Sequence, residues 1–249
     1  MGLAKICSRA IVCPLRQAVW VRSRQRSSLS DDLTYNMDKK ATWDRFYTEN
    51  QAERFKHFDW FFGYDVVSEF LLPFIRGKHS FSVLDVGCGT SDVGPGLYKH
   101  SATPVHVFCV DFSCVAVEHM RHQFLNLPKP KNCRSELHFM ESDATELKEF
   151  QSQSFNLVLD KGTSDALLRA SDGAKKASKV LLECLRVLKP HGNILQFSDE
   201  DPDARIPFLQ QANKDSGQDL SIAVQELGSF RGVNYFMYII NLQDLGSVL

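Results

Sequence analysis

The stretch Leu84–Ser91, with the sequence LDVGCGTS, decides the fold of this chain of 249 residues. A short and largely apolar run, Ser82–Val86, predicts a buried strand. Gly87 and Gly89 then form a Gly-x-Gly turn, where the missing Cβ atoms let the backbone approach a ligand closely. A helix is predicted directly afterwards, over 91–100, and its first turn offers free N–H groups. Gly-x-Gly alone is weak evidence, because many tight turns contain it.

Strands and helices alternate beyond this turn. Further strands are predicted at Val105–Val110, Glu136–Met140, Phe155–Leu159 and Asn193–Phe197. Helices are predicted at Ser113–Leu127, at Lys175–Leu188 and near Ala204–Asn213. Ser221–Leu227 and Val233–Asn241 alternate in period two and predict a final antiparallel strand pair. The pattern favours an α/β fold: a Rossmann-like, seven-stranded, mostly parallel sheet with helices on both faces.

Composition and charge exclude several functional classes. Apolar residues make up 43% and charged residues 24%, which is typical of a globular protein. Residues 31–249 carry a net charge of −7, so we expect no nucleic-acid partner, which would need a basic surface. No stretch reaches the roughly 18 apolar residues of a membrane span. The seven cysteines form no Cys-x-x-Cys pair, so we expect neither a metal site nor a disulfide framework.

Residues 1–30 differ from the rest of the chain. They carry six basic residues and no acid, and they are rich in serine. Leu3, Ile6, Ala10 and Ile11 recur near helical spacing. This composition is typical of a mitochondrial transit peptide, which predicts a location in the mitochondrial matrix and a folded domain over 31–249. The alternative is a basic tail without a role.

Aromatic residues are dense in the segment that follows, around Trp43 and again from Phe58 to Tyr64. The pattern from Trp43 to Ile75 is typical of helices, and we expect an N-terminal helical lid over about 40–77. Two interpretations stay open. The rings either pack in the core or cover a ligand with aromatic surface.

Carboxylates stand where four of the predicted strands end, at Asp85, Asp111, Asp143 and Asp160. Asp111 lies roughly 20 residues beyond the glycines, where doubly wound sheets place an acid that binds a ribose diol. Ligands of such sheets bind outside the carboxyl ends of the strands. The four acids therefore indicate a nucleotide-type site rather than packing.

The nature of the nucleotide follows from Asp92, which occupies the position of the third glycine in a dinucleotide motif. An acid there would repel a pyrophosphate. A ligand with a ribose and a cationic centre but no phosphate fits better, which favours S-adenosylmethionine. Asp85 is then expected to act on its ammonium group, directly or through water, and Asp143 to accept from the adenine amino group. Alternatively, Ser142 or Asp143 merely caps the next helix.

These motifs resemble those of the seven-stranded S-adenosylmethionine-dependent methyltransferases. Asp160–Ala166, with the sequence DKGTSDA, is similar to the Asp-Lys-Gly-Thr motif of protein-lysine methyltransferases that act on folded proteins. Phe58–Asp65 and Gln196–Asp203 carry the more specific part of the likeness, which extends from about residue 43 to the end. The resemblance implies transfer of a methyl group from S-adenosylmethionine to a lysine of citrate synthase in the mitochondrial matrix, without a metal.

The resulting prediction assigns each candidate residue to one side of the reaction. We expect the methyl donor to be bound by Asp85, Gly87, Gly89, Asp111, Phe112, Asp143 and Ala144. We expect Trp60 and Tyr64 to form an aromatic channel for the acceptor lysine, and Asp199 and Asp201 to attract a basic substrate surface. Asp160 is the candidate catalytic residue, because it is placed to hydrogen-bond the amine; it is as well suited to a turn or cofactor role.

Three alternatives remain. A methyltransferase of the same fold that acts on small molecules is one, although such enzymes often add a capping domain and this body is compact. A nicotinamide-dependent oxidoreductase is disfavoured by Asp92 and by the absence of the third glycine. A non-catalytic partner protein that binds S-adenosylmethionine is the last.

Overall fold

The computed structural model describes residues 29–50, 59–77, 79–125, 129–214, 219–230 and 232–242. In this part of the chain the strands are β1 Phe81–Val86, β2 Val105–Asp111, β3 Glu136–Glu141, β4 Phe155–Lys161, β5 Leu188–Ser198, β6 Leu220–Phe230 and β7 Val233–Leu242. The helices are α2 Leu29–Tyr35, α3 Lys40–Asn50, α4 Tyr64–Leu71, α5 Val93–His100, α6 Cys114–Gln123, α7 Thr163–Leu168, α8 Gly173–Val187 and α9 Pro202–Ala212, with a short 3₁₀ helix at Leu72–Phe74.

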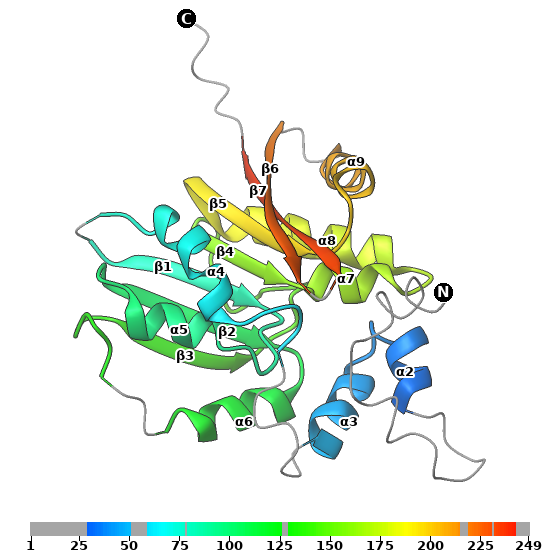
Figure 1. Ribbon diagram of the computed structural model, residues 1–249, viewed down its shortest axis with the longest axis horizontal. Coiled ribbons are helices and arrows are strands. Elements are labelled where there is room, and N and C mark those ends of the chain that lie inside the picture. Colours follow the sequence, from blue (N-terminus) through cyan, green and yellow to red (C-terminus); the bar gives the residue numbers. More distant parts are fainter. Residues whose placement is uncertain are drawn as a thin grey trace, which may run out of the picture.

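The strands form one seven-stranded sheet in the order β3-β2-β1-β4-β5-β7-β6 (Figure 1). Strands β1 to β5 are parallel to one another, whereas β7 is antiparallel to both β5 and β6. The predicted α/β fold and its final antiparallel pair are confirmed. The largest shift concerns β5, which begins at Leu188 rather than at Asn193. Its pairing with β4 includes a register shift between Phe155 and Leu157, which are paired with Leu188 and Asn193.

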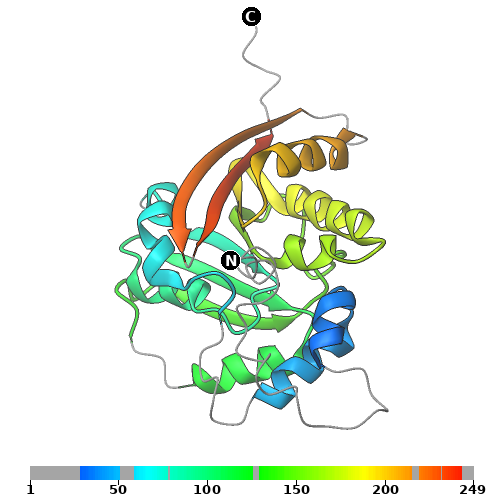
Figure 2. The same cartoon turned by 45° about the vertical axis from the view of Figure 1, so that its right-hand side comes forward.

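Helices cover both faces of the sheet. Apolar residues of α4, α5 and α6 pack on one face, and those of α7, α8 and α9 pack on the other (Figure 2). Helix α8 shows why, since Val180, Leu181 and Cys184 form a buried stripe while Lys175 and Lys179 face solvent. This amphipathic pattern drives the helix onto the sheet.

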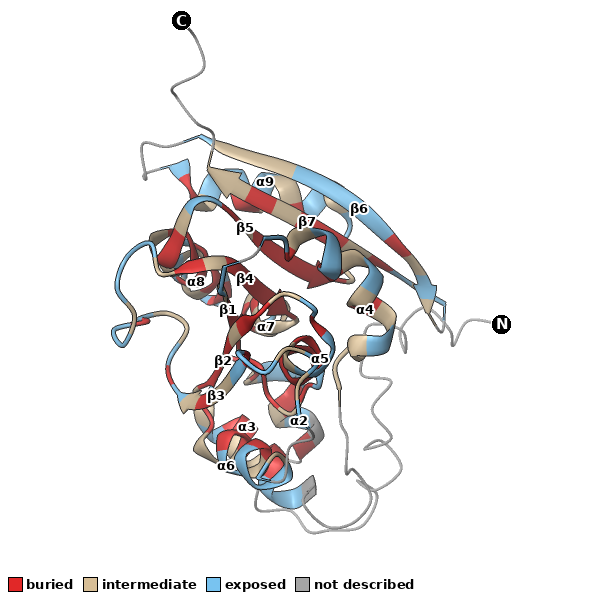
Figure 3. Ribbon diagram, turned by 90° about the vertical axis from the view of Figure 1, so that its left-hand side faces the viewer, coloured by how far each residue is buried: buried red, intermediate tan, exposed pale blue. Residues whose placement is uncertain are grey.

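Burial increases towards the middle of the sheet. Strands β1 and β4 are largely buried, whereas the edge strand β6 exposes residues 223–226 (Figure 3). A central strand packed between two helical layers reads as a nearly continuous apolar run, which is why these strands could be predicted. None of the helices in the described part of the chain has both the length and the apolar character needed to cross a bilayer.

The N-terminal helices form a separate small core. Leu33, Trp43 and Phe46 are buried together against Ala116 of α6. The helical pattern predicted over Trp43–Ile75 is wrong for 59–63, where Phe61 takes a left-handed backbone with φ of 67°. The predicted transit peptide lies outside the described residues, apart from Leu29 and Ser30, which begin α2. Residues 51–58 of the predicted lid also lie outside them.

Gly94 allows α5 to pack closely on β2. A Cβ atom at this position would overlap the sulfur of Cys109 and lie 3.4 Å from Val107 Cγ1 and 3.1 Å from Asp85 Oδ2. Close helix–strand packing is also the role of the third glycine in a dinucleotide-binding motif. The chain therefore has a glycine with this packing role, two positions later than in that motif.

We expect the substitution Gly94→Ala to lower the free energy of unfolding by about 1–3 kcal/mol, because it overpacks the α5–β2 contact. The variant Cys109→Ala removes the sulfur that the new methyl group meets. In the Cys109→Ala background, Gly94→Ala should therefore lower the free energy of unfolding clearly less than it does in the wild type. Urea unfolding of the wild type, both single variants and the double variant measures the coupling. An equal cost in both backgrounds would contradict this account of the contact.

Candidate functional site

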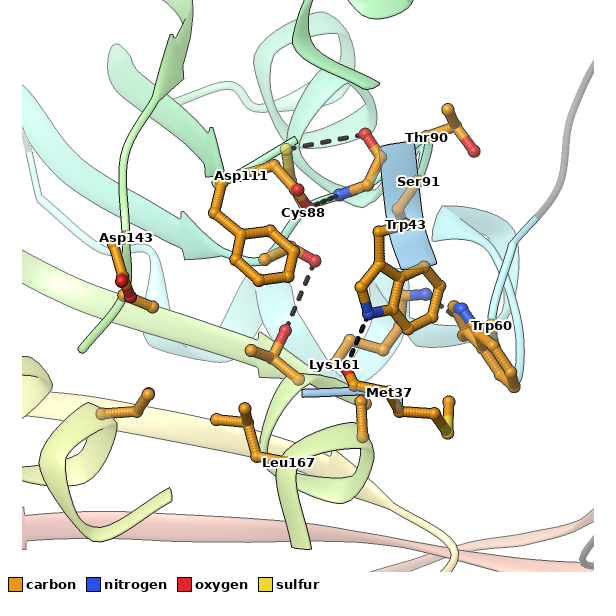
Figure 4. Close-up of a pocket in the computed structure, with 18 of the residues that line it drawn as sticks. Met37, Trp43, Trp60, Cys88, Thr90, Ser91, Asp111, Asp143, Lys161 and Leu167 are labelled. Carbon is orange, nitrogen blue, oxygen red and sulfur yellow. Dashed lines mark hydrogen bonds between the residues drawn. The ribbon is translucent and has the colours of Figure 1, made fainter. Parts of the chain in front are cut away.

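A cavity of about 750 Å³, including its opening to solvent, lies at the carboxyl ends of the central strands. Six of the seven residues predicted to bind the cofactor line it: Gly87, Gly89, Asp111, Phe112, Asp143 and Ala144. Figure 4 shows Asp143 and Trp60 at opposite sides of this cavity, with Asp111 between them in the view. The strand ends therefore bring the predicted residues together, with the exception of Asp85.

The turn after β1 requires two residues without a side chain, Gly87 and Gly89. Gly87 and Gly89 have φ angles of 60° and 52°, in the left-handed region that glycine tolerates best. The side chain of Thr163 fills the space that a Cβ of Gly87 would take. Thr163 Oγ1 donates a hydrogen bond of 3.0 Å to the carbonyl of Val86. The turn after β4 is thus locked onto the turn after β1.

Asp111 is held by two backbone donors at the end of β2. Its Oδ2 accepts from the N–H of Gly89 and its Oδ1 from the N–H of Ser113, each at 2.8 Å. The side chain is buried, and burial raises the pKa of Asp111 to about 6 although both N–H groups oppose the shift. A carboxylate oxygen can accept a second hydrogen bond. Asp111 therefore keeps the capacity to bind hydroxyl groups of a ligand in the cavity.

Asp143 and Ala144 lie at the end of β3, on the cavity wall. Asp143 Oδ1 accepts from the backbone N–H and from the hydroxyl of Thr145, each at 2.8 Å. These contacts lie within the turn that follows β3, and Asp143 keeps its place on the wall. The alternative, a cap of the next helix, is wrong, because the chain passes from β3 through turns to β4 without a helix. Leu167 and Val180 add apolar surface to the same cavity. A flat apolar ring with a polar edge fits this combination.

Asp85 does not line the cavity. Its side chain is buried and turns towards Gly94 beneath the first turn of α5, because β1 directs it to the helix-covered face. Burial raises the pKa of Asp85 to about 7, and the positive charge of Lys161 opposes this shift. A direct contact with the ammonium group of a ligand in the cavity would require a different side-chain direction.

Asp92 also stays outside the cavity wall. Its Oδ1 accepts a hydrogen bond of 2.6 Å from the backbone N–H of Tyr64 and so fixes the start of α4. This contact turns the carboxylate towards the loop that precedes α4, so Asp92 would repel a pyrophosphate less than predicted.

The loop at 59–63 joins two sides of the cavity. Asp59 forms an ion pair with Lys161, and its Oδ2 accepts from the hydroxyl of Ser91 at 3.0 Å. Lys161 Nζ also donates to the carbonyl of Trp60 at 2.7 Å. Burial raises the pKa of Asp59 despite the neighbouring ammonium group. Trp60 lines the cavity, and its ring meets Trp43 edge-on at 5.9 Å. The sequence pattern did not single out Asp59, Lys161 or the Ser91 contact.

Tyr64 does not reach the cavity, although it was expected to form a channel with Trp60. As the first residue of α4 it packs on α5, where its ring stacks on His100 at 5.5 Å and fills the space beside Gly96. Four positions separate it from Trp60, but the non-helical loop between them turns the two rings in different directions.

Asp160 lies beside the cavity wall without lining it. Its carboxylate accepts from the backbone N–H groups of Thr163 and Ser164 at 3.1 and 3.2 Å, from Gln196 Nε2 at 2.9 Å and from the Ser164 hydroxyl. Burial raises the pKa of Asp160, and the Ser164 hydrogen bond opposes the shift. These contacts tie β4, α7 and β5 together. A direct catalytic contact stays a prediction.

A second cavity of about 580 Å³ lies on the other face of α7 and is lined by Asp165, Arg169, Asp199, Glu200 and Arg205. Burial and the charge of Asp165 raise the pKa of Asp199, while Arg169 opposes the shift. The neighbouring Asp201 caps α9 and accepts from the N–H of Asp203 at 2.9 Å. Of the two acids predicted to meet a substrate, Asp199 lines a cavity and Asp201 has a local structural contact.

Two further features complete the site. Met37, Trp43 and Tyr47 bring the N-terminal helices to the first cavity, where the sequence indicated a lid without naming its contacts. Among the described residues, no group of three or more His, Cys, Asp or Glu side chains is arranged to hold a metal ion.

Comparison with known proteins agrees with this geometry. A family model described as a methyltransferase domain matches residues 78–232. A solved S-adenosylmethionine-dependent methyltransferase from Leishmania major shares the fold, with a TM-score of 0.55 and 15% identity over 91% of this chain and 89% of that one. A protein of Danio rerio named citrate synthase-lysine N-methyltransferase, mitochondrial, is 45% identical over 235 residues, which cover 91% of this chain and 92% of the relative.

The protein of Homo sapiens with the same name is 47% identical over 210 residues, which cover 81% of this chain and 85% of the relative. Both likenesses extend beyond the matched methyltransferase domain and cover most of each relative. This chain therefore belongs to the methyltransferases, and within them to the family of the citrate synthase-lysine N-methyltransferases.

Proposed function

We propose that this chain transfers a methyl group from S-adenosylmethionine to a lysine of citrate synthase in the mitochondrial matrix. The family supports the reaction and the substrate, since the relatives at 45% and 47% identity are named for both. The basic, acid-free segment 1–30 supports the location. The observation that carries the proposal is the cavity at the strand ends, with Asp111 held by Gly89 and Ser113 at its centre.

The chemistry of the cavity wall fits this methyl donor. Asp111 would accept from the ribose hydroxyls, while Phe112, Asp143 and Ala144 would hold the adenine ring between apolar surface and one acceptor. Asp59 and Trp60 lie at the other end, next to Lys161. The carboxylates of Asp59, Asp111 and Asp143 outnumber the one lysine of this wall, Lys161, which is paired with Asp59. Such a wall suits a cationic ligand better than a phosphate-bearing one.

The donor supplies a sulfonium methyl group when it is bound, so the protein has to position a neutral amine. A free lysine has a pKa of about 10.4, and deprotonation at pH 7 costs roughly 4–5 kcal/mol. Burial against an aromatic surface lowers the pKa of an amine. We assign this role to the ring of Trp60, which packs edge-on against Trp43. Tyr64 is not assigned to it, because its ring packs against His100 of α5.

The acceptor protein is proposed to dock over α7. Asp199 and Glu200 line the second cavity, on the other face of this short helix from the donor cavity. Their carboxylates would attract basic side chains around the acceptor lysine. Asp201 remains a candidate for the same role, although its contact with Asp203 already gives it a function at the start of α9.

A direct methylation assay tests the proposal. We expect the purified chain to transfer tritium from labelled S-adenosylmethionine to purified citrate synthase, on a lysine identified by mass spectrometry. The variant Asp111→Ala loses the ribose contact, so we expect its affinity for S-adenosylhomocysteine to fall by about 10-fold or more. The control is Glu136→Gln, an exposed residue on β3 away from the cavity. Thermal unfolding verifies that each variant is folded.

The alternatives give different results in the same assay with mitochondrial extract. Label in small molecules instead of protein favours a small-molecule methyltransferase. Tight S-adenosylhomocysteine binding without label in any acceptor favours a non-catalytic partner. Labelling that is unchanged in Asp111→Ala contradicts the assigned donor site.

A second prediction concerns the acceptor side. We expect Asp199→Asn to raise the KM for citrate synthase by about 2- to 5-fold, the effect of one partly exposed ion pair, and the increase should shrink at high salt. Affinity for S-adenosylhomocysteine should not change. Asp203→Asn is the matched control, because Asp203 is exposed nearby and does not line the second cavity. Equal KM values for both variants would exclude Asp199 from docking.

A third prediction separates two roles of Asp160. We expect Asp160→Asn to lower the free energy of unfolding by about 1–3 kcal/mol, because an amide cannot accept all the donors that meet the carboxylate. If Asp160 also contacts the amine, kcat falls by about 100-fold at a temperature where the variant is folded. A folded variant with full kcat removes Asp160 from the mechanism.

A further inference from the structure

Tyr47 is a buried polar residue on the wall of the donor cavity to which the proposed function gives no role. Helix α3 carries it, and its ring stacks on Trp43 at 6.0 Å and meets Phe46 edge-on at 5.2 Å. The residue is 8% exposed and lines the cavity. Packing therefore fixes the ring, and with it the position of the hydroxyl group.

The hydroxyl of Tyr47 reaches the glycine turn. It occupies the space that a side chain at Gly89 would take. Burial raises the pKa of Tyr47 well above its usual value, and the negative charges of Asp111 and Asp59 act in the same direction. The phenol therefore stays protonated. It is a neutral hydrogen-bond donor near the acid assigned to the ribose and the acid at the other end of the cavity.

Several other polar groups of the same wall already donate within the protein. Their donor–acceptor pairs are Ser91 to Asp59, Ser142 to Glu149, Thr145 to Asp143, Lys161 to Asp59 and Thr163 to the carbonyl of Val86. The hydroxyl of Tyr47 differs from these groups, because it has no hydrogen-bond partner among the residues that the structure describes. The side chain is largely buried and lines the cavity, so a ligand there can accept the hydrogen bond of this hydroxyl.

The chemistry of S-adenosylmethionine indicates which of its groups this donor meets. The ribose hydroxyls and the ammonium group donate hydrogen bonds, and the carboxylates of Asp111 and Asp59 are suited to accept them. The carboxylate at the amino-acid end is different, since it needs a donor and is repelled by both acids. We propose that the Tyr47 hydroxyl donates a hydrogen bond to this carboxylate. The inference rests on the proposed function and makes α3 part of the donor site.

Two ligands that differ in the carboxylate alone test this assignment. Affinities for S-adenosylmethionine and for its decarboxylated analogue are measured by calorimetry or by displacement of labelled S-adenosylhomocysteine. We expect Tyr47→Phe to weaken S-adenosylmethionine binding by about 10-fold, the effect of one hydrogen bond to a charged group. Binding of the decarboxylated analogue should change by less than about 2-fold. The control is Tyr35→Phe, which changes a hydroxyl on the neighbouring helix α2 that is 73% exposed.

Each outcome either supports or overturns the assignment. A loss confined to S-adenosylmethionine supports it, and unchanged thermal unfolding of Tyr47→Phe shows that the loss is not a folding defect. An equal loss for both ligands places the hydroxyl on the nucleoside, and no loss for either removes Tyr47 from binding; both results overturn the assignment. Failure of the wild type to bind either ligand would instead refute the proposed function.

Discussion

The contact between Thr163 and Gly87 determines the shape of the donor cavity. Because Gly87 has no side chain, the Thr163 hydroxyl reaches the carbonyl of Val86 and joins the turns that follow β4 and β1. The β1 turn in turn presents the N–H of Gly89 to Asp111 at 2.8 Å. Two motifs more than 70 positions apart in the chain thus hold one carboxylate at the mouth of the sheet.

The site concentrates carboxylates under conditions that disfavour their charge. Burial raises the pKa values of Asp59, Asp85, Asp111 and Asp160, and several of these groups also repel one another. The ammonium group of Lys161 opposes this rise in pKa for Asp59 and Asp85 without reversing it. A ligand with a sulfonium cation and an ammonium group would relieve part of the remaining repulsion. The electrostatics of the site therefore agree with the chemistry of the family to which the chain belongs.

The sheet and the acids at its edge were predictable from the sequence, because buried parallel strands are apolar runs and their carboxyl ends meet. The direction in which individual side chains point could not be predicted from the sequence. Asp85 and Tyr64 turn to the helix-covered face, since Gly94 and Gly96 leave room there. The left-handed conformation of Phe61 has no local signal, and it separates Trp60 from Tyr64. The contacts of Asp59 and Lys161 depend on residues about 100 positions apart, which no local pattern reveals.

A crystal structure of the chain with S-adenosylhomocysteine tests the central claim most directly. The account predicts the ribose on Asp111, the adenine beside Asp143 and the sulfur directed towards Trp60. A ligand seated elsewhere, or a cavity that takes a phosphate-bearing nucleotide in its place, would contradict it.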